Sequence, residues 1–226
     1  MCNNRDPISP SRPLNTPVLL PDTTTLPHPG QGMSWGRLIG ASLALAAAEL
    51  AQAVDRPVVL LAEDPRHADQ LELEIRFFAD DDLPVEHFVE WETLPWDSFS
   101  PHQDIVSERL RVLAAMPHMR RGVIIAATTA LQQRLPPLDY VAARSLSLAK
   151  GQELPREKFT DSLVAAGYLR VPQVSEHGEF AVRGSLIDLF PMGTNEPVRI
   201  DFFGDEIESL RYFSPENQMS GDPVDA

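Results

Sequence analysis

Apolar side chains recur in two patterns along this chain, at helical spacing in some stretches and as short continuous runs in others. Leu71, Ile75 and Phe78 are spaced as on one face of a helix. The continuous apolar runs are typical of strands that are covered on both faces of a parallel sheet. We predict strands over residues 57–62, 85–90 and 122–127, and helices over residues 38–54, 65–78 and 105–116. Alternating elements of this size predict βαβ units, and therefore an α/β domain on a parallel sheet.

The pattern changes after Tyr140. A short strand is predicted over residues 145–148, followed by a helix over residues 155–166 that ends at Gly167. Leu163 and Ala166 are expected on the inner face of this helix. A β-rich segment follows over residues 179–213. Its second and third strands, residues 198–203 and 206–213, are joined by Gly204-Asp205, which suits a two-residue hairpin turn. These elements predict a small α+β domain with an antiparallel sheet.

Domain bounds follow from these changes and from the distribution of proline. Residues 1–34 are predicted to form a disordered tail, because seven of the 21 prolines lie in the first 30 residues and apolar surface there is scarce. The α/β domain is assigned to residues 35–143. The α+β domain, with the start of a return to the first domain, is assigned to residues 144–226.

The predicted strand over residues 198–203 has two different faces. One face carries Val198, Ile200 and Phe202, and the other carries Arg199, Asp201 and Phe203. The first is an ordinary core face. A large aromatic side chain beside an arginine is typical of a protein-binding surface, because it joins an apolar anchor to a planar cation with several donors. We therefore predict that this part of the chain is bound by another protein.

Charge and composition narrow the function further. The formal net charge of -14 argues against nucleic-acid binding by the whole chain, since affinity for nucleic acids comes mainly from neutralising phosphates. Cys2 is the sole cysteine, so a disulfide framework within one chain is excluded, as suits a reducing compartment. No window resembles a signal peptide or a membrane span. We expect a cytoplasmic protein without membrane contact.

Catalytic and metal-binding patterns are missing where they would be expected. A phosphate-binding loop before the first strand would need a lysine, but Gly36 and Gly40 are followed by apolar residues. The six histidines lack the spacing that places two ligands on one helical face, and surface or capping roles are expected for them. Nothing resembles a nucleophile elbow. We expect no catalytic residues, no metal and no cofactor.

Two long signatures resemble those of a known family. The loop W-E-T-L-P-W-D-S-F-S-P-H-Q-D of residues 91–104, leading into I-V-S-E-R-L, is one; the other combines residues 176–193 with residues 199–211. Both resemble the N-terminal region of the bacterial transcription-repair coupling factors (Mfd), and the resemblance covers residues 35–215. That region is similar to the first and inserted domains of the excision-repair subunit UvrB, with which the R-G-x-x-I-D-L-F-P motif is shared.

The resemblance implies a fold and a partner. It implies a degenerate helicase-like (RecA-like) first domain without an ATP site, and an inserted domain that binds UvrA. The family's contact residues match Arg183, Arg199 and Phe203 here. Periodicity alone does not select Arg183, although it shares a face with Ala181. The alternatives are an intramolecular salt bridge for each arginine and a second small core for Phe203.

The resemblance also leaves two other functions open. One is an ATP-dependent, UvrB-like helicase or damage-binding subunit, which the missing lysine and the absence of room for an aromatic hairpin argue against. The other is masking, in which the same face packs on the C-terminal region of its own full-length protein. RNA polymerase and DNA would be bound only by domains absent here, since the chain resembles an N-terminal fragment.

Overall fold

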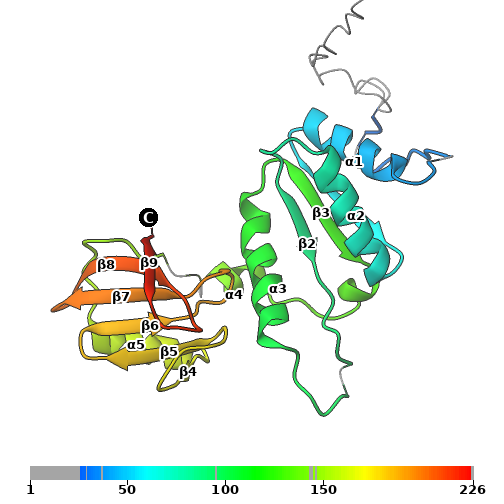
Figure 1. Cartoon of the computed structure of the whole chain (residues 1–226). Helices are drawn as coiled ribbons and strands as arrows, with labels where there is room; N and C mark the ends of the chain where they lie inside the picture. Colours follow the sequence, from blue (N-terminus) through cyan, green and yellow to red (C-terminus); the bar gives the residue numbers. More distant parts are fainter. Residues whose placement is uncertain are drawn as a thin grey trace, which may run out of the picture.

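Two units follow one another along the chain, an N-terminal unit of residues 42–127 and a C-terminal unit of residues 156–223 (Figure 1). The computed structural model describes residues 26–28, 30–36, 38–94, 96–142, 145 and 147–224. Most of the predicted tail therefore lies outside the described residues, and its described part forms neither helix nor strand. None of the described helices is long and apolar enough to cross a membrane.

The N-terminal unit is a parallel sheet of three strands with helices on both sides (Figure 1). Its elements are α1 (Ser42–Ala53), β1 (Pro57–Ala62), α2 (Pro65–Phe78), β2 (Val85–Phe88), α3 (Gln103–Ala115) and β3 (Gly122–Ala127). The strand order is β1-β3-β2, so β3 is central and all six of its residues are buried. This burial explains its uninterrupted apolar sequence. The α/β prediction is confirmed for this unit.

Local signals set the helix starts in this unit. Asp64 caps α2 by accepting a hydrogen bond from the amide of His67, and Pro65 occupies the first turn. In contrast, α1 begins at Ser42 rather than at residue 38, because Gly40 adopts a left-handed φ of 58° just before it. Buried alanines bring α1 close to the sheet and to α2.

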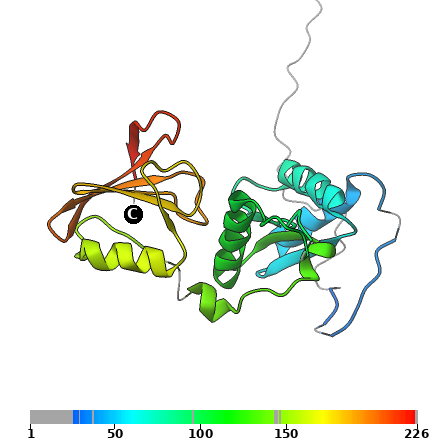
Figure 2. The same ribbon diagram turned by 90° about the horizontal axis from the view of Figure 1, so that it is seen from below.

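The C-terminal unit is a six-stranded sheet with one helix packed on it (Figure 2). Its elements are α5 (Arg156–Ala165), β4 (Leu169–Arg170), β5 (Glu179–Arg183), β6 (Leu186–Leu189), β7 (Val198–Phe203), β8 (Glu206–Phe213) and β9 (Ser220–Pro223). The strands are in sequential order, and the hairpin at Gly204-Asp205 is confirmed. The sheet is mixed rather than antiparallel, because β4 pairs in parallel with β5 while every later pair is antiparallel.

Two predictions for the C-terminal half are wrong. The described residues of 145–148 form no strand; Leu148 instead packs against the core of the C-terminal unit. Ala166 is exposed, because α5 ends at Ala165 and Gly167 turns the chain away with a φ of 95°. The inner face of α5 is made by Phe159 and Leu163.

The sheet of the C-terminal unit has a core on each face. The larger core lies between the sheet and α5, and it contains Phe159, Leu163, Phe180, Ile187, Leu189, Ile200, Phe202, Ile207 and Leu210. A smaller core on the opposite face contains Val174, Ala181, Phe190 and Phe213. The segment around Val174, which precedes β5, covers this second core. The face predicted to be polar is therefore partly covered.

The two units meet along α3, which lies on the side of the N-terminal unit nearest the C-terminal unit (Figures 1 and 2). The ring nitrogens of His177 lie 2.7 Å from an Asp104 carboxylate oxygen and 2.8 Å from the Thr194 carbonyl oxygen. The Gly193 amide donates to the Ser107 hydroxyl at 2.8 Å. Helix α4 (Leu138–Ala142) lies in the connection between the units and contacts α3.

Candidate protein-interaction face

The candidate site is the outer side of β5, β6 and β7, opposite α5, which we call the interaction face. It carries Arg183, Asp188, Arg199 and Phe203. The register aligns Ala181 with Asp188 and Asp188 with Arg199, so these side chains lie in one row across the three strands. Arg183 pairs with Leu186 and Leu186 pairs with Asp201, so these three residues form the adjacent row on the same face.

Arg199 is held by a buried carboxylate. Its Nε donates to Asp188 Oδ1 at 2.7 Å and its Nη2 donates to Asp188 Oδ2 at 3.0 Å, a bidentate pair. Its Nη1 donates to the main-chain oxygen of Gln218 and to the hydroxyl of Ser220, and its guanidinium lies 5.0 Å from the centre of the Phe213 ring. The hydrogen bonds to Asp188 raise the pKa of Arg199. Most of its donors are used within the chain.

Asp188 is the acidic centre of the interaction face. Its side chain is 1% exposed, and a buried carboxylate is stable only when it is paired and hydrogen-bonded. Arg183 contributes a second cation, because its Nη1 lies 3.9 Å from Asp188 Oδ2. The two arginines therefore share one buried counter-ion.

Arg183 is the more accessible of the two arginines. Its side chain is 41% exposed, against 16% for Arg199. Its Nη2 donates to the Pro172 carbonyl oxygen at 3.1 Å and to Gln218 Oε1 at 3.4 Å. Geometry thus gives the two arginines different environments, one anchored in the chain and one at the surface.

Phe203 lies apart from both arginines, at the end of β7 beside the hairpin turn. It is 77% exposed, while its neighbour Phe202 is 3% exposed and packs in the larger core. The bulge next to it falls on β8, where Glu208 has no partner in the register, so the alternation along β7 is preserved. The prediction of one core face and one outer face for β7 is confirmed.

Sequence reasoning missed two residues of the interaction face. Asp188 had a readable signal, since an acidic residue inside the apolar stretch L-I-D-L-F requires a cationic partner when the strand is buried. Gln218 had none, because it reaches the arginines only through the shape of the turn between β8 and β9.

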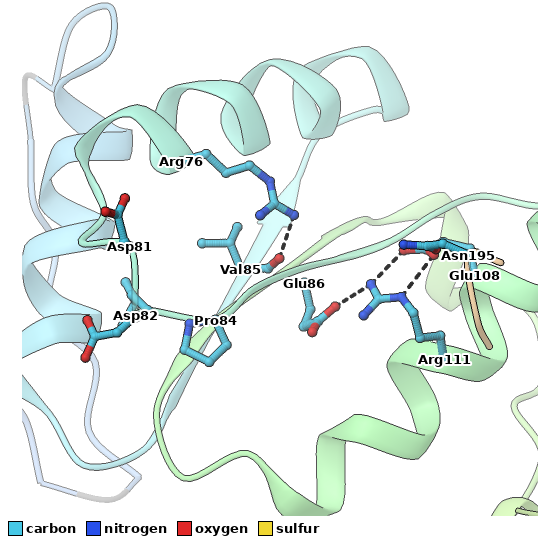
Figure 3. A pocket seen from close by; sticks show the side chains of 10 residues that line it. Arg76, Asp81, Asp82, Pro84, Val85, Glu86, Glu108, Arg111 and Asn195 are labelled. Carbon is cyan, nitrogen blue, oxygen red and sulfur yellow. Dashed lines mark hydrogen bonds and ion pairs between the residues drawn. The ribbon is translucent and has the colours of Figure 1, made fainter. Parts of the chain in front are cut away.

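A hollow of about 580 Å³ lies elsewhere, between the C-terminal end of α2, β2 and α3 (Figure 3). It is lined by Arg76, Asp81, Asp82, Leu83, Pro84, Val85, Glu86, Glu108, Arg111 and Asn195. In Figure 3, Arg111 lies between Glu86 and Glu108 and donates to both, which raises its pKa. The lining is dominated by carboxylate and guanidinium groups, and the Arg111 side chain is paired with two of those carboxylates.

Two ionisable side chains are buried in the N-terminal unit. His87 is 8% exposed and its Nδ1 lies 2.8 Å from Glu72 Oε2; this hydrogen bond lowers the pKa of Glu72. The expected surface or capping role is therefore wrong for His87. Arg109 is stacked between the rings of Phe88 and Trp91 and donates to the Val89 carbonyl oxygen. Burial lowers the pKa of Arg109 to about 10.

Comparison with known proteins identifies relatives for most of the chain. Residues 146–226 match the family model of the UvrB interaction domain. The chain is 47% identical over 203 residues to the transcription-repair-coupling factor of Escherichia coli K12, covering 89% of this chain. It is 38% identical over 211 residues to that of Haemophilus influenzae, and 32% identical over 189 residues to that of Staphylococcus aureus USA300, covering 93% and 82% of this chain. It spans only 18%, 18% and 16% of these relatives' lengths.

Proposed function

Because residues 146–226 belong to the UvrB interaction domain family and most of the chain is related to the transcription-repair-coupling factors, we propose that it is a non-catalytic recruitment module. Its partner in this proposal is UvrA, and its process is transcription-coupled nucleotide excision repair of damaged DNA. The degenerate, helicase-like N-terminal unit serves as a support and hydrolyses no ATP.

The observation that carries the proposal is Phe203, a large aromatic side chain that is 77% exposed on the same face as a partly exposed arginine. Exposed aromatic and arginine side chains are the residue types enriched in binding hot spots, and here they lie at separate points of one face. In the proposal, Phe203 fills an apolar pocket of UvrA, while Arg183 pairs with acidic or carbonyl groups at another point of the same interface. Arg199 contributes mainly by holding the face in shape, since most of its donors are already used.

The proposal includes regulation within the full-length protein, which we call the parent protein. The same interaction face packs against the C-terminal region of the full-length protein at rest and becomes free when that protein is engaged. RNA polymerase and DNA are bound by regions outside this chain. The parent protein acts as an ATP-dependent DNA translocase in the cytoplasm.

Calorimetric titration of the chain with UvrA, without DNA or ATP, tests the proposal. We expect Phe203→Ala to weaken binding by about 30-fold, which corresponds to ~2 kcal/mol for the loss of a hot-spot aromatic. Arg183→Ala should weaken it by a similar factor. Phe77→Ala and Arg66→Ala are matched controls, because both side chains are exposed on α2 of the other unit.

Two results would contradict the proposal. One is undiminished affinity in a variant that combines Arg183→Ala, Arg199→Ala and Phe203→Ala. The other is DNA-stimulated ATP hydrolysis by the purified chain, which would favour the UvrB-like helicase instead. Absence of binding by the folded wild-type chain would favour the masking role.

A further inference from the structure

Gln218, in the turn between β8 and β9, is contacted by both arginines of the interaction face. Its side-chain Oε1 accepts from Arg183 at 3.4 Å, and its main-chain oxygen accepts from Arg199 at 3.2 Å. Its Nε2 donates to the Val174 carbonyl oxygen at 3.1 Å and to the Pro215 carbonyl oxygen at 2.8 Å. One residue thus links the turn, the segment that covers the second core, and both guanidinium groups.

The backbone of Gln218 is in a conformation that side chains disfavour. Its φ is 60°, and among the described residues Glu92 is the only other non-glycine with a positive φ. A glycine would adopt this conformation without strain, whereas a larger side chain costs free energy there. The hydrogen bonds of the glutamine amide and its contact with Arg183 offset that cost. The glutamine side chain therefore makes stabilising contacts at this position that a glycine could not make.

We propose that Gln218 is a positioning residue of the interaction face. Together with the Pro172 carbonyl oxygen, it restricts the guanidinium of Arg183 by accepting from Nη2, while its own amide is fixed by two main-chain carbonyl groups. A preorganised cation binds its partner more tightly than a mobile one, because less rotamer freedom is lost on binding. This inference rests on the proposed function for its partner, UvrA.

Gln218→Gly is the sharpest test, because it keeps the left-handed φ and the main-chain carbonyl that Arg199 contacts, and removes only the side chain. We expect UvrA to bind this variant about tenfold more weakly, the loss typical of one or two hydrogen bonds. Glu92→Gly is the matched control: it relieves the same kind of backbone strain in the N-terminal unit, and its affinity should stay within about twofold of wild type.

Non-additivity separates positioning from a general structural effect. If Gln218 acts through Arg183, the variant with both Arg183→Ala and Gln218→Gly should bind no more weakly than Arg183→Ala alone. Fold-losses that multiply, or a Gln218→Gly variant with wild-type affinity, would overturn the inference while leaving the proposed function intact.

Nuclear magnetic resonance of the arginine side chains gives a readout that does not depend on UvrA. In Gln218→Gly, rotation of the Arg183 guanidinium should become faster, while that of Arg199 stays slow because its bonds to Asp188 remain. Unchanged Arg183 rotation would refute positioning directly. Failure of the wild-type chain to bind UvrA would instead remove the proposed function, and with it the recruitment role of Gln218.

Discussion

Replacing Arg199 with methionine should destabilise the C-terminal unit, because it leaves the carboxylate of Asp188 buried without its main counter-ion. The Asp188 side chain is 1% exposed, and each of its carboxylate oxygens loses the Arg199 nitrogen that donates to it, at 2.7 Å for Oδ1 and 3.0 Å for Oδ2. Removing one member of a buried ion pair typically costs ~3–5 kcal/mol. Arg183 remains 3.9 Å from Asp188 and compensates in part, so we expect a loss of about 3 kcal/mol, near the lower end of this range.

Urea unfolding followed by far-ultraviolet circular dichroism measures this loss as a change in the extrapolated free energy of unfolding. Tryptophan fluorescence serves as an internal reference, because Trp35, Trp91 and Trp96 all precede the C-terminal unit. The circular-dichroism transition of Arg199→Met should shift while the fluorescence transition moves much less. Arg211→Ala is the matched control, since Arg211 is exposed on β8 directly across from Arg199.

A double variant isolates the cause. Asp188→Leu combined with Arg199→Met replaces the ion pair by apolar side chains, a change that is often neutral in buried sites. We expect the double variant to recover most of the stability lost by Arg199→Met. A double variant as unstable as the single one would refute the reasoning, because the loss would not then come from an unpaired buried charge.

Three further outcomes are expected. Gly122→Ala should destabilise the N-terminal unit by at least about 2 kcal/mol in urea unfolding followed by tryptophan fluorescence, because φ is 129° and a Cβ atom would lie 2.6 Å from the Pro84 carbonyl oxygen; Gly32→Ala, with nothing within 4 Å, should be neutral. Glu72→Gln should make the free energy of unfolding depend less on pH in the acid range. Because the pKa of Glu72 is lowered in the folded state, its stabilising contribution is present above the ordinary value of 4.5 and is lost as pH falls through the lower folded-state value. An unchanged profile of stability against pH would contradict this. His177→Ala should loosen the contact between the units, detected as faster amide hydrogen exchange at the start of α3; unchanged exchange there would contradict a bridging role for His177.

Elements with strong periodicity could be predicted from the sequence alone. The bounds of β1, α2, β3, β7 and β8 are those predicted from continuous apolar runs, helical spacing and a glycine turn. The expectation that both faces of β1 are covered is wrong, because Val59 and Leu61 on this edge strand are 58% and 59% exposed. The short strands β4 and β9 were missed, since two and four residues with exposed side chains carry no hydrophobic pattern. They form because neighbouring strands offer them backbone partners.

The residues of the interaction face could be predicted only in part from the sequence, for a similar reason. Alternation placed Arg199 and Phe203 opposite Ile200, which is correct, but it gave no measure of how exposed each side chain is. Exposure depends on the turn between β8 and β9, which comes from further along the chain and brings Gln218 over Arg199. Arg183 was selected only by resemblance to a family. The assignment of all three residues to UvrA binding stays a prediction.

Because the C-terminal sheet is packed on both faces, only some residues of the interaction face can change during evolution without loss of stability. Arg199 belongs to the interaction face and also contacts Phe213 of the second core, so a substitution that adapts it to a changed partner also disturbs Asp188 and Phe213. Phe203 has no comparable role in stability, because its side chain is exposed at the end of β7. Drift in partner preference should therefore accumulate first at Phe203 and the hairpin turn, while the row across Asp188 and Arg199 changes only through paired substitutions.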